Sequence, residues 1–261
     1  MGHKAPILTY HSIDDSCSVI SISPDKFRSQ MYYLRDNNFN VISLQDIVTC
    51  LRKKIPFPPR SIAITFDDGL KNFYKVAYPI LNNLGFTAIV FLVPGYCGKN
   101  NKWEGQPEGI PVLDILDWEE VREMAGNGVE FGAHTMNHAD LLKLSIEQAR
   151  EEIVSSKQVI EKNLEKDVQF FAYPYGGLNN EIKGIVKKHF SGAASVNMDF
   201  VSLKSDVYTL PRIDMYYFSN NNLFKYIGTP IFSVYVTFRS ILRSIRNKIN
   251  VVSKLQQKHK H

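Results

Sequence analysis

The sequence predicts an α/β protein, a distorted (β/α)7-8 barrel in a single domain that is followed by a basic amphipathic helical extension. Short apolar runs alternate with amphipathic stretches from residue 6 to residue 196, the pattern of repeated strand–helix units and a parallel sheet. The chain has 261 residues and is 44% hydrophobic, enough for one large core. No glycine-rich phosphate loop follows a strand, which weakens the nucleotide-binding versions of such sheets and favours a barrel.

Each strand of the expected sheet is a short apolar run bounded by polar or turn-forming residues. These runs lie at residues 6–10, 40–42, 61–66, 86–92, 129–133, 168–172 and 193–196. In barrels of this kind the chemistry gathers at the carboxyl ends of the strands. Polar side chains that directly follow these runs are therefore the first candidates for a functional site.

The helices are placed by their start signals and by apolar residues three to four positions apart. Ser23 and Pro24 open the first helix, a short helix covers residues 44–51, and residues 73–84 carry the spacing of the third. The fourth begins near Asp117, and Ser145 with Gln148 forms a capping box for a helix to about residue 164. The last covers residues 180–189, and residues 94–111, rich in Gly and Pro, form a loop.

Cysteine usage and the start of the chain indicate a reducing compartment. Cys17, Cys50 and Cys97 are odd in number and far apart, which argues against a disulfide framework and against a thiolate metal site. Residues 1–6 lack the apolar stretch of a secretory signal, and no run of eighteen apolar residues occurs. We therefore expect a cytoplasmic protein, or one bound peripherally to a membrane.

Two adjacent carboxylates, Asp67 and Asp68, follow the apolar run 61–66. Neighbouring residues at a strand end point in different directions, so one carboxylate can bind a metal while the other faces the group that the metal activates. Asp next to Gly also often caps a helix or forms a turn, so the pair alone is ambiguous.

Two histidines, His134 and His138, follow the next-but-one strand at a spacing of four residues. On one helical turn their rings would lie side by side, and with an aspartate from the earlier strand end they would complete an open divalent-metal site. Such histidine pairs also occur by chance. Both features at barrel strand ends are much harder to explain without a metal.

Three motifs in this order resemble the polysaccharide deacetylases of carbohydrate esterase family four, the NodB homology domain. They are residues 65–69 (Thr-Phe-Asp-Asp-Gly), 134–138 (His-Thr-Met-Asn-His) and 171–176 (Phe-Ala-Tyr-Pro-Tyr-Gly). The motifs span about residues 7–214, and the combination is far more specific than any one of them. The resemblance implies a distorted (β/α) barrel and the metal-dependent removal of N-acetyl, less often O-acetyl, groups from sugars.

By this resemblance, Asp68, His134 and His138 are the metal ligands and Asp67 is the general base. The metal is expected to be Zn2+, with Co2+, Ni2+ and Mn2+ as alternatives, and it would lower the pKa of a bound water and polarise the acetyl carbonyl. A backbone N–H near Tyr175 would help to stabilise the oxyanion. Tyr173, Pro174 and Tyr175 could otherwise be only a rigid turn, but beside a metal site they would form a groove wall for sugar rings.

The sequence departs from the family at two places. Many members carry an Arg after the Phe of the third motif, where this chain has Ala172, and a late Leu-x-His, where it has Leu210-Pro211-Arg212. Arg212 is our candidate to orient Asp67 in place of the missing Arg. The alternative is a structural salt bridge from Arg212 to Asp206 or Asp214.

The missing late histidine leaves the general acid unassigned. His11 ends the first strand at the expected mouth of the barrel, and imidazole titrates in the useful pH range. The Tyr10–His11 pair resembles the first strand of exopolysaccharide deacetylases that act on poly-N-acetylglucosamine, a branch that also departs at the late motifs. His11 is therefore our candidate acid, although it could only pack or bind substrate. Trp103 and Trp118 could line the substrate groove, although a Trp that opens a helix after Asp117 is more often a core residue.

The chain divides into a barrel at residues 1–222 and a basic extension at residues 223–261. Net charge is +5, but positions 1–214 carry 23 Lys and Arg against all 26 Asp and Glu, so the excess belongs to the tail. One helical face would carry Phe238, Ile241, Leu242, Ile245, Ile249 and Val252. We favour a helix packed on the barrel, with peripheral membrane contact as the alternative.

The partner expected from these features is an N-acetylated polysaccharide or oligosaccharide. Nucleic acid is not favoured, because the basic residues lie in the tail and not around the expected mouth. Two other functions stay open: hydrolysis of a non-sugar amide, and carbohydrate binding with weak or no turnover. An activating base beside a metal site argues against a pure binder.

Overall fold

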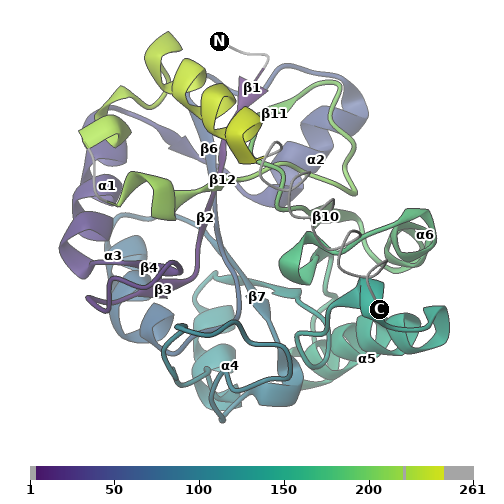
Figure 1. Ribbon diagram of the computed structural model, residues 1–261. Helices are drawn as coiled ribbons and strands as arrows, with labels where there is room; N and C mark the ends of the chain where they lie inside the picture. Colours follow the sequence, from purple (N-terminus) through teal and green to yellow (C-terminus); the bar gives the residue numbers. More distant parts are fainter. Residues whose placement is uncertain (1–3, 220–221, 244–261) are drawn as a thin grey trace, which may run out of the picture.

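A computed structural model describes residues 4–219 and 222–243 of the chain, and in this range parallel strands are surrounded by helices (Figure 1). The main sheet is the eight-stranded, curled sheet of a (β/α) barrel. Its order is β10 (Gly192–Ala194), β9 (Phe170–Ala172), β8 (Glu130–Ala133), β7 (Ile89–Leu92), β6 (Ser61–Phe66), β2 (Ile7–Tyr10) and β12 (Ile213–Asp214), with β5 (Asn40–Val41) also paired to β6.

The segment before β12 brings the two ends of the sheet together. Ala194, at the end of β10, forms a parallel bridge with Leu210, whereas Ile213 pairs with Leu8 of β2. Residues 210–213 thus run between the first and last strands of the sheet. Arg212 sits in this junction and is buried.

The helices are α1 (Pro24–Asp36), α2 (Leu44–Lys53), α3 (Tyr78–Asn83), α4 (Trp118–Gly126), α5 (Ile146–Leu164) and α6 (Asn180–His189). A π-helical segment, η1 (Phe73–Ala77), leads into α3, and short 3-10 turns lie at Pro94–Tyr96, Leu141–Lys143, Pro174–Gly176, Met215–Phe218 and Asn222–Tyr226. Two small strand pairs complete the described part: β1 (Lys4–Ala5) with β11 (Val201–Ser202), and β3 (Ser12–Ile13) with β4 (Ser21–Ile22).

Side-chain caps explain where several helices begin. The side chains of Ser23 and Asn179 accept hydrogen bonds from the first turns of α1 and α6, and Ser43, Asp117 and Ser145 form full capping boxes at α2, α4 and α5. Each cap satisfies backbone N–H groups that have no partner within the helix. The helix starts that were predicted near Asp117 and Ser145 are confirmed.

The sheet separates two apolar clusters, because alternate strand residues point to opposite faces. Leu8, Ile64 and Val90 belong to the larger cluster, which includes the outer helices. Ile7, Ala63, Phe91 and other residues of opposite parity belong to the second, together with Ile47 and Val48 of α2. Thr9 lies two residues after Ile7, and Thr65 and Asp67 lie two and four residues after Ala63. Their side chains therefore point to the same side of the sheet, toward the barrel interior near its mouth.

Gly132 is required by the close approach of β7 and β9 to β8. A Cβ at this position would lie 2.5 Å from the Phe91 ring and 2.9 Å from the carbonyl oxygen of Phe170. Neither group can easily retreat, since both belong to neighbouring strands. The glycine therefore lets β8 carry His134 to the mouth of a tightly packed sheet.

Residues 230–243 are helical and pack on the barrel through one face only. Phe232 and Val236 are buried, and the Phe232 ring stacks on Phe218 with centroids 4.8 Å apart. Phe238 and Ile241, from the face predicted to pack, are more than half exposed, and Leu242 is also exposed. Ile245, Ile249 and Val252 lie outside the described residues, and membrane contact stays a prediction.

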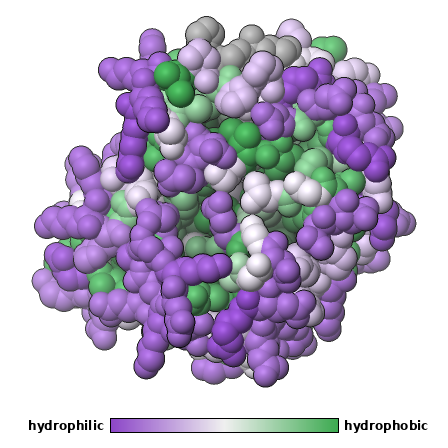
Figure 2. Space-filling model, turned by 180° about the vertical axis from the view of Figure 1, so that it is seen from behind, coloured by the Kyte–Doolittle hydropathy of each residue, from purple (hydrophilic) through white to green (hydrophobic). Residues whose placement is uncertain are grey.

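One face of the molecule is mainly polar (Figure 2). Figure 2, which views the molecule from behind Figure 1, shows mainly hydrophilic side chains, with apolar ones gathered in the upper half of that face. Among the described residues no helix is both long and apolar enough to cross a bilayer.

Candidate active site

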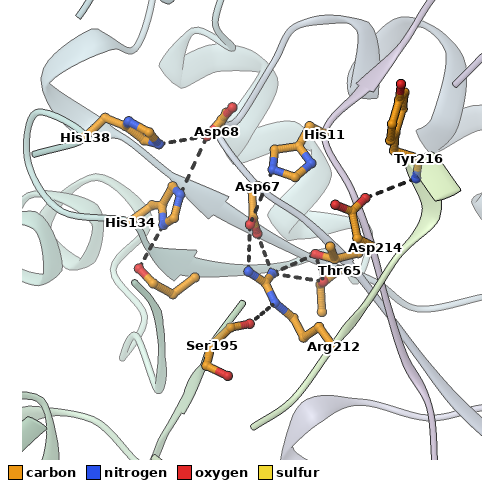
Figure 3. Close-up of polar contacts among 12 residues, drawn as sticks. His11, Thr65, Asp67, Asp68, His134, His138, Ser195, Arg212, Asp214 and Tyr216 are labelled. Atoms are coloured by element: carbon orange, nitrogen blue, oxygen red, sulfur yellow. Dashed lines mark hydrogen bonds and ion pairs between the residues drawn. The ribbon is translucent and has the colours of Figure 1, made fainter. Parts of the chain in front are cut away.

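The candidate residues converge at the carboxyl ends of the parallel strands, as Figure 3 shows for the polar contacts among them. Asp67 and Asp68 directly follow β6, and His134 directly follows β8. The backbone N–H of Asp67 donates to the carbonyl of Tyr10 at 3.0 Å, which extends the strand ladder to the carboxyl edge of the sheet. Asp68 has a left-handed φ of 73°, so the chain turns there and the two carboxylates point apart.

The expectation of a helical turn between His134 and His138 is wrong. Residues 134–138 form a loop in which Thr135 and His138 have φ values of 62° and 58°. The Thr135 hydroxyl accepts a hydrogen bond from the N–H of Ala139 at 3.1 Å, which holds the loop folded. The two imidazoles still meet, with ring centroids 4.9 Å apart.

Asp68, His134 and His138 form a group that fits one divalent cation. One potential ligand atom from each lies within 4.8 Å of the others. Oδ1 of Asp68 is 3.6 Å from Nε2 of His134 and 3.3 Å from Nε2 of His138, and this buried oxygen has no hydrogen-bond partner within the described chain. One carboxylate and two imidazoles leave positions free for water and substrate, as catalytic metal sites require.

Both imidazoles are held with Nε2 toward this centre. Nδ1 of His134 lies 2.8 Å from the carbonyl oxygen of Ala172, so Nδ1 carries the proton and Nε2 keeps its lone pair. Burial lowers the pKa of His134 to about 4. The ring is therefore neutral at physiological pH, which is the form that binds metal.

Arg212 holds the second carboxylate, that of Asp67. Its Nη1 donates to Oδ1 at 2.6 Å and its Nη2 to Oδ2 at 2.7 Å. Nη1 also donates to the hydroxyl of Thr9 at 2.7 Å and lies 3.3 Å from that of Thr65, while Nε donates to the carbonyl of Ser195 at 3.1 Å. A buried charge pair of this kind persists only when its remaining groups are also hydrogen-bonded.

Arg212 contacts Asp67, whereas its alternative partners, Asp206 and Asp214, make other contacts. Asp206 pairs with Lys183, and Asp214 accepts a hydrogen bond from the N–H of Tyr216. Burial disfavours the charged form of Asp67, but the charge and hydrogen bonds of Arg212 outweigh it and hold the pKa of that carboxyl well below its ordinary value. Asp67 is therefore ionised, and its role as base stays a prediction.

His11 lies beside Asp67 at the mouth. Its Nε2 is 3.8 Å from Oδ2 of Asp67, and about a quarter of the side chain is exposed. An imidazole that touches both the pocket and the candidate base can exchange protons with a bound molecule. The structure thus places His11 where an acid would be needed, without assigning that role.

Tyr173 and Tyr175 have different environments. Tyr173 is buried, and its hydroxyl donates to the carbonyl of Tyr208 at 3.0 Å. Tyr175 is 43% exposed, and its hydroxyl lies 3.0 Å from Nδ1 of His138. Pro174 is buried between them in a 3-10 turn. Of these three residues only Tyr175 is exposed, so its ring is the one on which a sugar could stack.

Two cavities meet at this place. The candidate residues line a pocket of about 530 Å³, and a second hollow of about 1020 Å³ adjoins it, with Pro107 and Tyr175 lining both. The pocket also includes Arg243 from the C-terminal helix. We call these two adjoining cavities the groove.

Several residues of the site were missed by reasoning from the sequence. Thr9 and Thr65 bind Arg212 from the middle of apolar strands, and a polar residue of inward parity in such a strand was the available signal. Trp103 was expected only as a possible groove residue. It is buried, and its ring stacks on His138 with centroids 4.3 Å apart. No local pattern indicated that contact.

The comparisons with known proteins agree on one family. Residues 54–190 match the family model described as polysaccharide deacetylase. The poly-beta-1,6-N-acetyl-D-glucosamine N-deacetylase of Staphylococcus aureus is 30% identical over 203 residues, which cover 74% of this chain and 67% of that protein.

Solved structures agree in fold. The deacetylase PplD of Streptococcus pyogenes, in complex with acetate, superposes with a TM-score of 0.71 at 26% identity, covering 82% of this chain and 93% of that one. IcaB from Ammonifex degensii superposes with a TM-score of 0.70 at 25% identity, covering 82% and 92%. These matches confirm the predicted (β/α) barrel.

Proposed function

The chain belongs to the polysaccharide deacetylase family, and from that premise we propose that it hydrolyses N-acetyl groups of an N-acetylhexosamine polymer, with poly-β-1,6-N-acetylglucosamine as the first candidate. The observation that carries the proposal is the convergence of Asp68, His134 and His138 beside a second, Arg-bound carboxylate in one open pocket. The name of the Staphylococcus aureus relative supports the choice of polymer.

The family is metal-dependent, and the residues present fit its metal. Asp68, His134 and His138 would hold a divalent cation, which supplies a Lewis acid that polarises the acetyl carbonyl and makes water more acidic. Zinc is the proposed ion, because an oxygen and two imidazole nitrogens with free positions suit it. Co2+, Ni2+ and Mn2+ are alternatives with the same ligands.

Hydrolysis adds one water across the amide: a C–O bond forms, the C–N bond breaks, and acetate and a free amine leave. Asp67 has lone pairs that Arg212 does not occupy, and these orient the attacking water and accept its proton. Arg212 makes Asp67 a weak base but fixes its direction. We propose that His11 protonates the departing nitrogen, a role supported by its position 3.8 Å from Asp67.

Removal of metal gives the test of this proposal. Protein stripped with a chelator should release less than about 1% of the acetate that the zinc-loaded protein releases from β-1,6-linked N-acetylglucosamine oligomers, since Lewis-acid activation contributes several kcal/mol. Acetate is measured by a coupled assay, with chitin and peptidoglycan fragments as other substrates. Equal release from stripped and loaded protein, or release from none of these sugars, would refute the proposal.

Replacement of His11 tests the assignment of the acid. His11→Ala should lower the turnover number about 100-fold, the lower end of the range for a general acid, while metal affinity stays unchanged. The matched control is His189→Ala, at the end of α6 and remote from the mouth. Near-normal turnover of His11→Ala would show that His11 only packs or binds substrate.

A further inference from the structure

Tyr175 contacts the metal site through its side chain, a contact distinct from the backbone role expected for this residue. Nδ1 of His138 lies 3.0 Å from the Tyr175 hydroxyl, and the ring centroids are 4.7 Å apart with the planes nearly perpendicular. The same hydroxyl is 3.4 Å from the carbonyl oxygen of Gly105. When Nε2 of His138 binds a cation, Nδ1 would carry the proton and donate to the Tyr175 hydroxyl.

The three groups form a chain of hydrogen bonds with one consistent direction. In this tautomer His138 donates to Tyr175 and Tyr175 donates to the Gly105 carbonyl, so the Tyr175 hydroxyl both accepts and donates one hydrogen bond. The indole of Trp103 covers the His138 ring at an interplanar angle of 26°.

The backbone is strained to place Tyr175 there. Its φ is 55°, in the left-handed region that is unfavourable for a non-glycine residue. Gly176 follows with φ 74°, and a Cβ there would lie 2.2 Å from Cγ2 of Val196, so the turn has little freedom. Strain that the surroundings maintain at a functional site points to a role for the strained residue.

The two histidines are anchored differently. His134 donates to a backbone carbonyl, that of Ala172, which is buried and does not depend on any side chain. His138 depends on a side chain that is 43% exposed and that lines both cavities of the groove. The more exposed of the two histidine contacts is thus made by a residue that also lines the groove.

We infer that Tyr175 is a positioning residue for the metal: its hydroxyl holds His138 in the tautomer and orientation in which Nε2 faces the cation. This inference rests on the metal site of the proposed function. Partners that orient a metal-binding histidine in this way typically contribute 10–100-fold to metal affinity. A sugar stacked on Tyr175 would contact the residue that also orients the ligand.

The test is the metal affinity of Tyr175→Phe, which keeps the ring and removes the acceptor. We expect its Kd for Zn2+, measured by competition with a chromophoric chelator on the metal-free protein, to rise about 10–100-fold. The visible spectrum of the Co2+ complex should also change. The matched control, Tyr173→Phe, removes a hydroxyl that donates to Tyr208 and should leave the Kd within twofold of the wild type.

Further measurements separate positioning from a merely structural role. The thermal midpoint of metal-free Tyr175→Phe should equal that of the wild type, and in a His138→Ala background the same change should not alter the Kd, because the residue acts through His138. A Kd for Tyr175→Phe within twofold of the wild type would overturn the inference. If the wild type binds zinc but releases no acetate, the proposed function fails, and a raised Kd still supports the inference.

Discussion

Asp67→Asn is expected to lower the turnover number for acetate release at least ~1000-fold, while the protein still binds its metal. An amide keeps the size of the side chain but cannot take a proton from water, and a positioned base contributes about 10²–10⁴-fold. Nor can it accept both hydrogen bonds from Arg212, since one of its two polar atoms is a donor. The substitution therefore removes both the proton acceptor and the two-pronged contact with Arg212, and only Asp67 provides them.

The measurement is steady-state acetate release at a temperature where wild type and variant are both folded, with metal content determined on the same samples. Asp167→Asn is the matched control, because Asp167 is an exposed carboxylate paired with Lys157 on the surface. The control should turn over like the wild type. Turnover of Asp67→Asn within tenfold of the wild type, at full metal content, would exclude Asp67 as the base.

Arg212→Met is expected to destabilise the fold by about 3–5 kcal/mol, the usual effect of removing one partner of a buried ion pair. Asp67 is 4% exposed and would keep its burial but lose its counter-charge. In the wild type the pKa of Asp67 is below its unfolded value, so the pair stabilises the fold above about pH 4 and this contribution is lost as pH falls further. Without Arg212 the same burial would raise that pKa.

Denaturant unfolding at pH 7 measures this loss. The double variant Asp67→Asn/Arg212→Met should recover part of it, because no buried charge is then left unpaired, but it should stay inactive. Arg212→Lys keeps the charge and loses the two-pronged contact, so its stability should lie between that of the wild type and that of Arg212→Met. Unfolding of Arg212→Met within about 1 kcal/mol of the wild type would mean that the pair is not important for stability.

The sequence was most informative about the candidate site residues that come directly after a strand. Asp67, Asp68 and His134 come immediately after apolar runs, and the parallel sheet brings such positions to one edge whatever the details of the loops. Helix starts were equally readable, because the caps at Asp117 and Ser145 are local interactions. Strand lengths were overestimated, as in β7, which begins at Ile89 and not at residue 86.

What the sequence could not provide depends on contacts between distant segments or on unusual backbone angles. The contact of Arg212 with Asp67 could be proposed, but its geometry depends on how residues 210–213 cross from β10 to β2. The loop at 134–138 looked helical because left-handed φ values at Thr135 leave no signature in the residue types. The stacking of Trp103 on His138 similarly depends on the path of the 94–116 loop.

The central claim is that Asp68, His134 and His138 hold one divalent cation. The most direct test is an anomalous difference map from crystals of the full chain grown with Co2+. We predict one strong peak within about 2.0–2.2 Å of a carboxylate oxygen of Asp68 and of Nε2 of both histidines. Crystals in which these three side chains are well ordered but carry no peak between them would contradict it.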